Sequence, residues 1–454
     1  MQRDKEKSLL TGLLVALSLI AYIYIGYFAR RHDTIPLILA YTSAFGAYYA
    51  LYILAKNASS YTWFNALSLM ARLSLIVAVP SLSDDVYRFI WDGELLASGL
   101  DSFAYTPEEY ATRGLLNENE KLSKLYSLLN SPGYFTIYPP FCQLIFYLSA
   151  VLSPKSILGS IIVIRLFILL AEGITLMLLP RMLRSYNIPP QTSLLYSLNP
   201  LVILELTGNL HFEAWAITGL LACIYFWRKN NILTAGFAMA LAVLSKLLPL
   251  ITIPLFFRKK DLVRSGIFFV TAGLMVLIAL IPYLDTNLLN GMKESSSLYF
   301  SRFEFNASVY YLVRTVGYWY KGYNIIATAG VVLAAIAGLL IIAFTLYYYR
   351  HKMKIPTAMM WVYVMYYCFT TTLHPWYTLM LLPLCLFSKW RFPVVWTAMV
   401  FLTYVGYTSA GYSENLWITA VEYLVVTGWM MYEATTGKID GYLIQRTIRK
   451  VLRS

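Results

Sequence analysis

The 454-residue sequence has few charged residues. Asp, Glu, Lys and Arg make up 13% of it, about half the share found in soluble globular chains, whereas apolar residues make up 59%. A soluble enzyme is therefore excluded. Although the net charge is +13, the cations lie in short loops between apolar stretches, so no basic stripe on a soluble domain predicts nucleic acid as a partner.

Cysteine is scarce too, and its four copies form no CxxC pair and have no histidine at metal-ligand spacing. All four lie in apolar stretches: Cys142, Cys223, Cys368 and Cys385. We therefore interpret them as small buried hydrophobic residues. The charged residues 1–7 precede a long apolar run at 8–29, which is too long for the core of a cleavable signal peptide and predicts a retained first membrane span.

Long apolar stretches fill most of the chain, and about 20 apolar residues cross a bilayer as a helix. Full spans are predicted near 8–29, 35–55, 60–80, 156–180, 191–210, 213–227, 265–284, 323–349, 356–373, 392–410 and 415–433. Three further stretches are shorter or broken by proline or Lys246, and predict half-helices or hairpins: 141–153, 232–257 and 376–387. The expected fold is a single all-α, polytopic membrane domain over residues 1–454, with about 11 to 14 transmembrane or half-membrane helices.

Basic loops set the expected orientation, because Lys and Arg accumulate in short cytoplasmic loops. Five clusters between spans and the basic tail, 434–454, can all be cytoplasmic if both termini are cytoplasmic. The segments 81–140 and 285–322 are then extracytoplasmic loops, and the first carries nine acidic residues against four basic ones. Arg30 and Arg31 alone disagree, because they fall on the outer side.

Two adjacent carboxylates, Asp84 and Asp85, follow the third apolar stretch, with Tyr87 and Arg88 directly behind them. Adjacent like charges raise one another's pKa, which suits a site where a carboxylate accepts a proton. The alternative is an acidic helix N-cap, which is compatible with catalysis.

Other polar groups interrupt apolar sequence, where an ionisable residue is by default a functional hypothesis. Lys246 precedes the helix-breaking Pro249, His374 lies between two apolar stretches, and His211 and Glu213 follow another. Each has an alternative role as an interfacial or snorkelling side chain. In the orientation given by the loop charges, however, they all reach the face that carries the two aspartates, and such convergence is typical of a site.

The ordered set of motifs resembles the GT-C superfamily of integral membrane glycosyltransferases, in its prokaryotic, polyprenyl-phosphate-sugar-dependent, mannosyltransferase-like branch. The matching elements span residues 81–383: Asp84-Asp85 with Tyr87-Arg88 and Trp91-Asp92-Gly93, Ser102 to Pro107, Tyr138-Pro139-Pro140, Asn199-Pro200 leading to His211-x-Glu213, Lys246 to Pro249, and His374 to Tyr377. Glu213 departs from the aspartate that relatives often carry, and the chain has no obvious soluble C-terminal domain.

The resemblance implies transfer of a sugar from a polyprenyl-phosphate donor to an acceptor at the outer face of the cell membrane, usually with inversion. One carboxylate of the pair Asp84 and Asp85 then serves as general base, the other as its partner; the sequence leaves open which. The residues expected near the carrier phosphate are Lys246 and His374, followed by Arg88 and Arg314. Those expected near sugar or acceptor are Tyr87, Tyr138, His211, Glu213 and Trp376.

The expected partners are the lipid donor, a glycolipid, glycan or protein acceptor, and membrane lipids. No cofactor is predicted: an aspartate pair can hold a divalent metal, but the leaving phosphate can instead be neutralised by Lys, Arg and His. Mannose is the expected sugar, with glucose or arabinose as alternatives. From another class of protein, a polyprenyl-lipid transporter or flippase would also place polar groups among spans, but we find no internal repeat.

Overall fold

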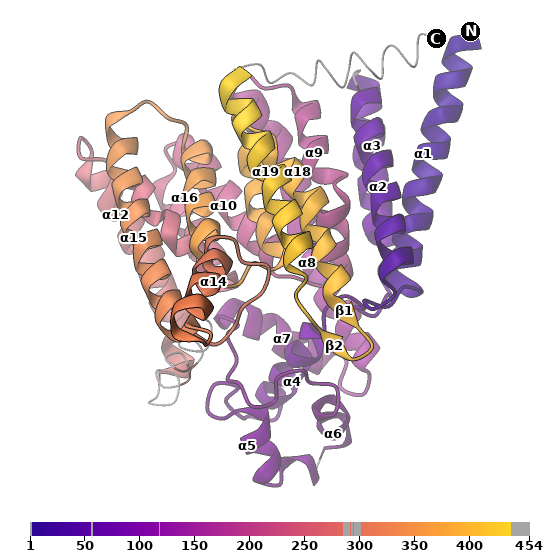
Figure 1. Cartoon of the computed structure of the whole chain (residues 1–454). Coiled ribbons are helices and arrows are strands. Elements are labelled where there is room, and N and C mark those ends of the chain that lie inside the picture. The colour runs from indigo at the N-terminus through magenta and orange to yellow at the C-terminus, as the bar shows by residue number, and fades with distance from the viewer. Residues whose placement is uncertain are drawn as a thin grey trace.

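The computed structural model describes residues 2–55, 58–117, 119–284, 291, 294 and 301–436 (Figure 1). These residues are mostly helical, and their one sheet is a hairpin of two short antiparallel strands, β1 (Tyr407–Thr408) and β2 (Gly411–Tyr412). The predicted all-α fold class is confirmed. The predicted basic tail from residue 437 onward and part of the loop 285–322 lie outside the described residues.

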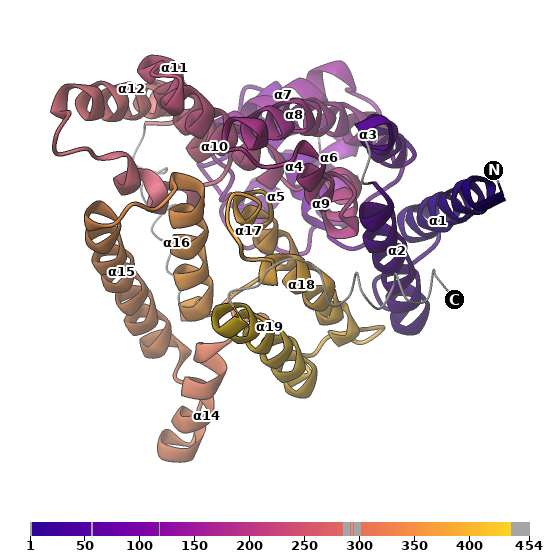
Figure 2. The ribbon, with the colours of Figure 1, turned by 90° about the horizontal axis from the view of Figure 1, so that it is seen from above.

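Five helices in the described part of the chain are long and apolar enough to cross a membrane. They are α1 (Gln2–Tyr27), α2 (Thr34–Leu54), α8 (Ile157–Ser185), α12 (Leu262–Leu280) and α15 (Ile326–Arg350). Seen from above, α1 and α2 stand at one side of the bundle and α12 and α15 at the other (Figure 2). The chain is a polytopic membrane protein, as predicted.

The remaining apolar stretches fold as shorter helices, because proline or a turn interrupts most of them. The ones predicted as full spans become α3 (Ala58–Leu73), α16 (Ile355–Phe369), α18 (Phe392–Met399) with η7 (Val400–Gly406), and the longer α19 (Leu416–Thr436). The three short stretches become α7 (Pro140–Leu152), α11 (Ile232–Ser245) with η4 (Leu248–Phe256), and η6 (Pro375–Met380) with α17 (Leu381–Cys385).

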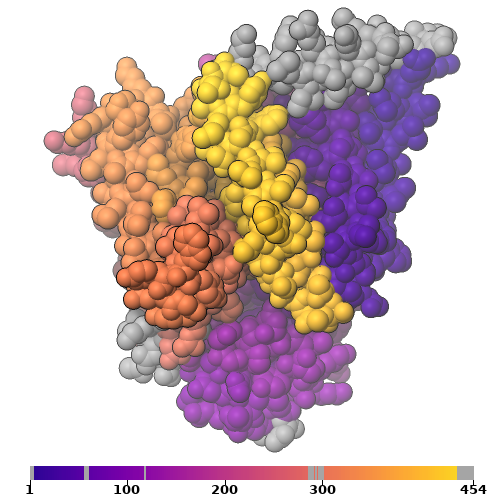
Figure 3. Space-filling view, viewed as in Figure 1, coloured from indigo at the N-terminus to yellow at the C-terminus, as the bar shows by residue number. Residues whose placement is uncertain are grey.

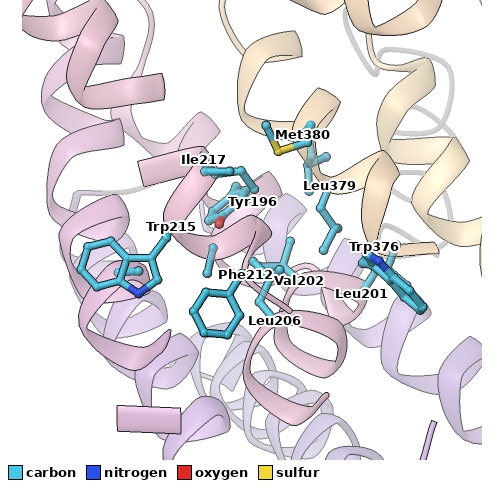
Figure 4. Close-up of a cluster of buried hydrophobic side chains, with 14 of the residues drawn as sticks. Tyr196, Leu201, Val202, Leu206, Phe212, Trp215, Ile217, Trp376, Leu379 and Met380 are labelled. Carbon is cyan, nitrogen blue, oxygen red and sulfur yellow. The ribbon is translucent and has the colours of Figure 1, made fainter. Parts of the chain in front are cut away.

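The predicted straight spans at 191–210 and 213–227 are instead a broken segment. It begins with η2 (Pro190–Ser193) and α9 (Leu194–Ser197), and then η3 (Val202–Gly208), a π-helix, meets α10 (Glu213–Arg228) at a bend of 111°. At the bend Leu210 adopts a φ of 66°, a left-handed conformation that is rare for a branched residue. Hydrophobic side chains of η3, α10 and η6 gather around it (Figure 4).

A buried arginine stabilises this bend. Arg165, on α8, donates to the carbonyl oxygens of Thr207 at 2.8 Å and Gly208 at 3.0 Å, and to that of Ile76 at 2.8 Å. A break inside a bundle frees backbone carbonyls that no water can reach, so a donor must come from a neighbouring helix. Arg165 therefore makes possible the sharp turn that brings His211 and Glu213 to one end of the bundle.

The predicted outer segment 81–140 folds as a small helical layer at one end of the bundle. It contains α4 (Asp85–Ala97), α5 (Pro107–Thr112), η1 (Leu115–Asn117) and α6 (Glu120–Tyr126). This layer lies at the bottom of Figures 1 and 3, opposite the first turn of α1 and the last turn of α19. The second predicted loop, 285–322, follows η5 (Ile281–Tyr283) and contains α14 (Val309–Lys321), which lies in the lower part of Figure 1.

Candidate active site

A largely apolar cavity of about 290 Å³ lies where the broken helices meet the outer layer. Its apolar walls come mainly from α11, η4, α12 and η6: Val243, Leu244, Leu247, Leu248, Val276, Leu280 and Met380. Tyr138 and the two prolines after it form the side that faces the outer layer. The charged members of the lining are Glu213 and Lys246, which are two of the residues that the sequence singled out.

Lys246 and Glu213 form an ion pair, with Lys246 Nζ 3.2 Å from Glu213 Oε1. Lys246 is extended at the end of α11, because the proline in the first turn of η4 prevents the helix from continuing. Its ammonium group also lies 5.4 Å from the ring centroid of Tyr138 and 5.9 Å from that of Tyr377. Glu213 Oε2 is buried and has no hydrogen-bond partner among the described residues. The pair is thus incompletely satisfied and borders a cavity.

The two aspartates have different partners, and only Asp85 contacts a residue of the cavity lining. Asp84 occupies the N-cap position of α4 but makes no side-chain capping bond, and its Oδ2 is 2.6 Å from Arg31 Nη2. Asp85 Oδ2 instead accepts a hydrogen bond from the Tyr138 hydroxyl at 3.1 Å. Because the Tyr138 ring faces Lys246, this bond connects Asp85 to the cavity lining.

Two histidines sandwich Trp376. Its ring centroid lies 3.8 Å from that of His211 and 4.5 Å from that of His374, with interplanar angles of 16° and 4°. Both faces of the indole are thus covered, which leaves only its edge for a substrate. On the far side of the stack, His211 Nε2 lies 3.3 Å from Glu205 Oε2.

His374 is partly buried in the loop between α16 and η6. Burial lowers the pKa of its imidazole to about 3; nearby Asp85 acts in the opposite direction, and His211 and Lys246 act in the same direction as burial. The imidazole is therefore neutral at physiological pH, and its Nδ1 has no hydrogen-bond partner in the described part of the chain. A neutral imidazole offers one donor and one acceptor but no positive charge for a phosphate.

Both predicted arginines have carboxylate partners outside the cavity lining. Arg88 Nε donates to Asp92 at 2.7 Å, and its Nη1 donates to the Tyr134 carbonyl at 2.7 Å. Arg88 thus braces the segment that leads to Tyr138. Arg314, on α14, pairs with Glu304. Tyr87 is half-buried on α4, and burial, followed by the charge of Asp84, raises its pKa.

Three residues near the site are not predicted from the sequence: Arg31, Tyr407 and Glu205. Arg31 is one of the two arginines that contradict the loop-charge pattern, and that exception is the only signal in the sequence. Tyr407, in the β1 strand, lies under the Arg31 guanidinium at 5.1 Å. Glu205, in η3, accepts a 2.6 Å hydrogen bond from the Tyr404 hydroxyl, and an acidic residue in an apolar stretch could have revealed it.

Possible metal ligands are sparse. The described residues contain no group of three or more His, Cys, Asp or Glu side chains arranged to hold a metal ion. The polar groups that the structure brings together near the cavity are a carboxylate hydrogen-bonded to a tyrosine, an ammonium group and two imidazoles.

The fold and the site define a polytopic membrane protein with a largely apolar cavity that an ion pair borders. The chain belongs to the family described as "Alpha-(1->6)-mannopyranosyltransferase, N-terminal domain", whose sequence profile matches residues 11–258. The predicted resemblance to mannosyltransferase-like GT-C proteins is thereby confirmed.

One curated relative is alpha-(1->6)-mannopyranosyltransferase A of Mycobacterium tuberculosis strain H37Rv, which is 26% identical over 162 residues. That match covers 36% of this chain and 30% of the relative, so the chain spans about a third of the length of the relative. No solved structure matches the chain significantly.

Proposed function

We propose that this protein transfers a mannosyl group from a polyprenyl-phosphate donor to an acceptor hydroxyl, with inversion, at the extracytoplasmic face of the cell membrane. The observation that carries the proposal is the ion pair of Lys246 and Glu213 in an apolar cavity, connected to Asp85 through Tyr138. The family match supports the reaction class and the sugar.

The cavity suits a lipid-linked donor better than a nucleotide sugar. Its walls are mostly aliphatic and aromatic, which favours an isoprenoid chain, and its cation is the single ammonium of Lys246. As the glycosidic bond breaks, negative charge grows on the carrier phosphate, and a fixed ammonium in an apolar surrounding stabilises that charge strongly. His374 would contribute a neutral hydrogen bond, whereas Arg88 and Arg314 are committed to carboxylates.

We assign Asp85 as the general base. Asp84 is paired with Arg31, whereas Asp85 is bonded to a tyrosine of the cavity. In the step that we propose, the acceptor oxygen bonds to the anomeric carbon as its proton passes to the Asp85 carboxylate. The bond between that carbon and the phosphate oxygen breaks, its electron pair stays on the phosphate, and the lipid phosphate leaves through an oxocarbenium-like transition state.

Sugar and acceptor hydroxyls would meet the remaining polar groups around the cavity. Glu213 Oε2, which is buried and has no partner in the part of the chain that the structure describes, is the best-placed acceptor for a sugar hydroxyl. Tyr138 would contribute its hydroxyl, and His211 and Trp376 would contribute ring edges, because their facing rings are stacked. Tyr87, half-buried on α4, would lie toward the acceptor, a glycolipid, glycan or protein. We propose no metal or other cofactor for this step.

The proposed orientation puts the layer 81–140 outside the cell and both termini in the cytoplasm. The basic loops support it, since most of them join helices at the end of the bundle opposite that layer. The exception, Arg31, has a local reason to lie outside, because it pairs with Asp84.

The test is a transfer assay with the full chain in proteoliposomes, using radiolabelled mannosyl polyprenyl phosphate and, separately, labelled nucleotide mannose. We expect transfer from the lipid donor alone, a loss of about 10²- to 10⁴-fold for Asp85→Asn, and a smaller loss for Asp84→Asn. Equal activity of Asp85→Asn and wild type would refute the base assignment. Glucosyl or arabinosyl polyprenyl phosphates as better donors would change the sugar, and lipid movement without transfer would establish a flippase.

A further inference from the structure

We propose that Arg31, in the turn between α1 and α2, is a positioning residue for the reaction. It holds the Asp84 carboxylate so that Asp85, the next residue, stays directed at Tyr138 and the cavity. This inference rests on the proposed function, since it gives Asp85 the role of base. Nothing in the family match or in the sequence pattern assigns such a role to this turn.

The contacts of Arg31 join three distant parts of the chain. Its Nη2 lies 2.6 Å from Asp84 Oδ2, at the start of α4, and its guanidinium lies 5.1 Å from the ring centroid of Tyr407, in the β1 strand. The Arg31 and Asp84 side chains are 34% and 28% exposed, so the pair is partly shielded from solvent. One guanidinium thus connects the turn after α1, the aspartate pair and the hairpin near the C-terminus.

The pair needs a cation because two carboxylates on consecutive residues repel each other. Without a counter-charge, ionised Asp84 would favour the protonated form of Asp85, which cannot accept a proton. The titratable groups around Asp84 are Arg31, Tyr87 and Tyr407; those around Asp85 are Tyr138, His374 and Tyr407. Arg31 is the cation of this set, and it contacts Asp84 directly.

The same charged groups also act on the hydroxyl of Tyr407. Burial raises the pKa of its hydroxyl to about 12, Arg31 lowers it, and Asp85 and Asp84 raise it. The guanidinium and both carboxylates therefore act on one ring. The direct carboxylate partner of Arg31 is Asp84, so we assign it a role that acts through Asp84.

The neighbouring Arg30 provides a matched control, because it carries the same charge one residue earlier and is exposed. We would measure kcat and donor KM against pH in proteoliposomes for Arg31→Met, Arg31→Lys and Arg30→Met. For Arg31→Met we expect kcat to fall about tenfold and the acidic limb of the profile to move up by about one pH unit, with donor KM unchanged. Arg31→Lys should recover part of both effects, and Arg30→Met should match wild type.

The double variant Arg31→Met/Asp84→Asn separates electrostatics from folding. It removes the repelling charge together with its cation, so its acidic limb should return close to the wild-type position, even if Arg31→Met alone accumulates poorly. The inference is overturned if the profile of Arg31→Met overlays that of Arg30→Met, or if the double variant keeps the shifted limb. If Asp85→Asn remains active, the base assignment in the proposed function is wrong. If Asp85→Asn is inactive but Arg31→Met has the pH profile of the wild type, only the role of Arg31 is overturned.

Discussion

Two cation-carboxylate pairs inside the bundle contrast sharply. Arg72, on α3, and Glu172, on α8, are both fully buried, and every charged end is occupied. Arg72 bonds to Glu172 at 2.7 Å and to the Ser197 carbonyl at 2.8 Å, and Glu172 accepts from the Tyr196 hydroxyl at 2.6 Å. In the pair of Lys246 and Glu213, by contrast, one carboxylate oxygen has no partner among the described residues and the ammonium borders a cavity.

We interpret the pair of Arg72 and Glu172 as part of the structural scaffold, and the pair of Lys246 and Glu213 as part of the candidate active site. A fully hydrogen-bonded buried pair fixes helices in place, and α3, α8 and α9 meet at Arg72. A buried carboxylate oxygen without a hydrogen-bond partner, such as Glu213 Oε2 among the described residues, destabilises the folded protein unless a ligand supplies that partner. We therefore infer that the pair of Lys246 and Glu213 has a function. If this account is correct, breaking the first pair should cost stability, and breaking the second should cost donor use.

The largest expected effect is the loss of stability on breaking the scaffold pair. Arg72→Met leaves the Glu172 carboxylate buried without its cation, which should lower the free energy of unfolding by about 3 to 5 kcal/mol. The measurement is thermal and denaturant unfolding of the purified protein in detergent. The double variant Arg72→Met/Glu172→Gln should recover most of the loss, and a double variant as unstable as the single one would show that packing, not charge, explains the cost.

Lys246→Met should reduce donor use more than stability. We expect kcat/KM for the lipid donor to fall about 100-fold, or about 2.7 kcal/mol, because the carrier phosphate loses its counter-charge. The unfolding midpoint should fall less than in Arg72→Met, because Lys246 borders a cavity whereas Arg72 and Glu172 are fully buried. Lys229→Met, at an exposed loop lysine, is the control. A large loss of stability with unchanged donor use would place Lys246 in the scaffold.

The pH dependence of stability should reveal the lowered pKa of His374. Its folded pKa is about 3, whereas an unfolded histidine has a pKa near 6.5, so the unfolded chain binds more protons between these values. Stability should thus be complete above pH 6.5 and fall as the pH drops, by about 2 kcal/mol from pH 7 to pH 5. His374→Asn should flatten this slope, whereas His351→Asn, at an exposed histidine, should leave it unchanged.

The smallest expected effect belongs to the Tyr138 hydroxyl. Tyr138→Phe keeps the ring near Lys246 but removes the hydrogen bond to Asp85, so kcat should fall about tenfold, or about 1.4 kcal/mol, with donor KM unchanged. Steady-state kinetics in proteoliposomes, with Tyr134→Phe as control, would show this. A rise in donor KM at constant kcat would show instead that the Tyr138 hydroxyl binds the donor and does not assist the general base.

The sequence predicts the fold class, and it singles out two charged residues that the structure brings together at the cavity. Apolar length identifies α1, α2, α8, α12 and α15, because hydropathy depends only on composition. Charges in apolar surroundings reveal Lys246 and Glu213, because burying them is costly without a purpose.

What the sequence cannot give is the bend at residues 208–212 and the partners of the charges. The bend depends on Arg165, which contacts it from another helix more than 40 positions away. Likewise, Arg31 meets Asp84 only because the turn between α1 and α2 lies near the start of α4, and local pattern contains no such information. Proline explains why some predicted spans end early, but the helical ends themselves are decided by packing.

The central claim is that Lys246, which pairs with Glu213 beside the cavity, holds a lipid phosphate. The most direct measurement is native mass spectrometry of the detergent-purified protein, incubated with polyprenyl phosphate and compared with its Lys246→Met and Lys229→Met variants. The account predicts one bound polyprenyl phosphate per chain in the wild type and in Lys229→Met, and loss of that mass in Lys246→Met. Equal lipid occupancy in all three proteins would contradict it.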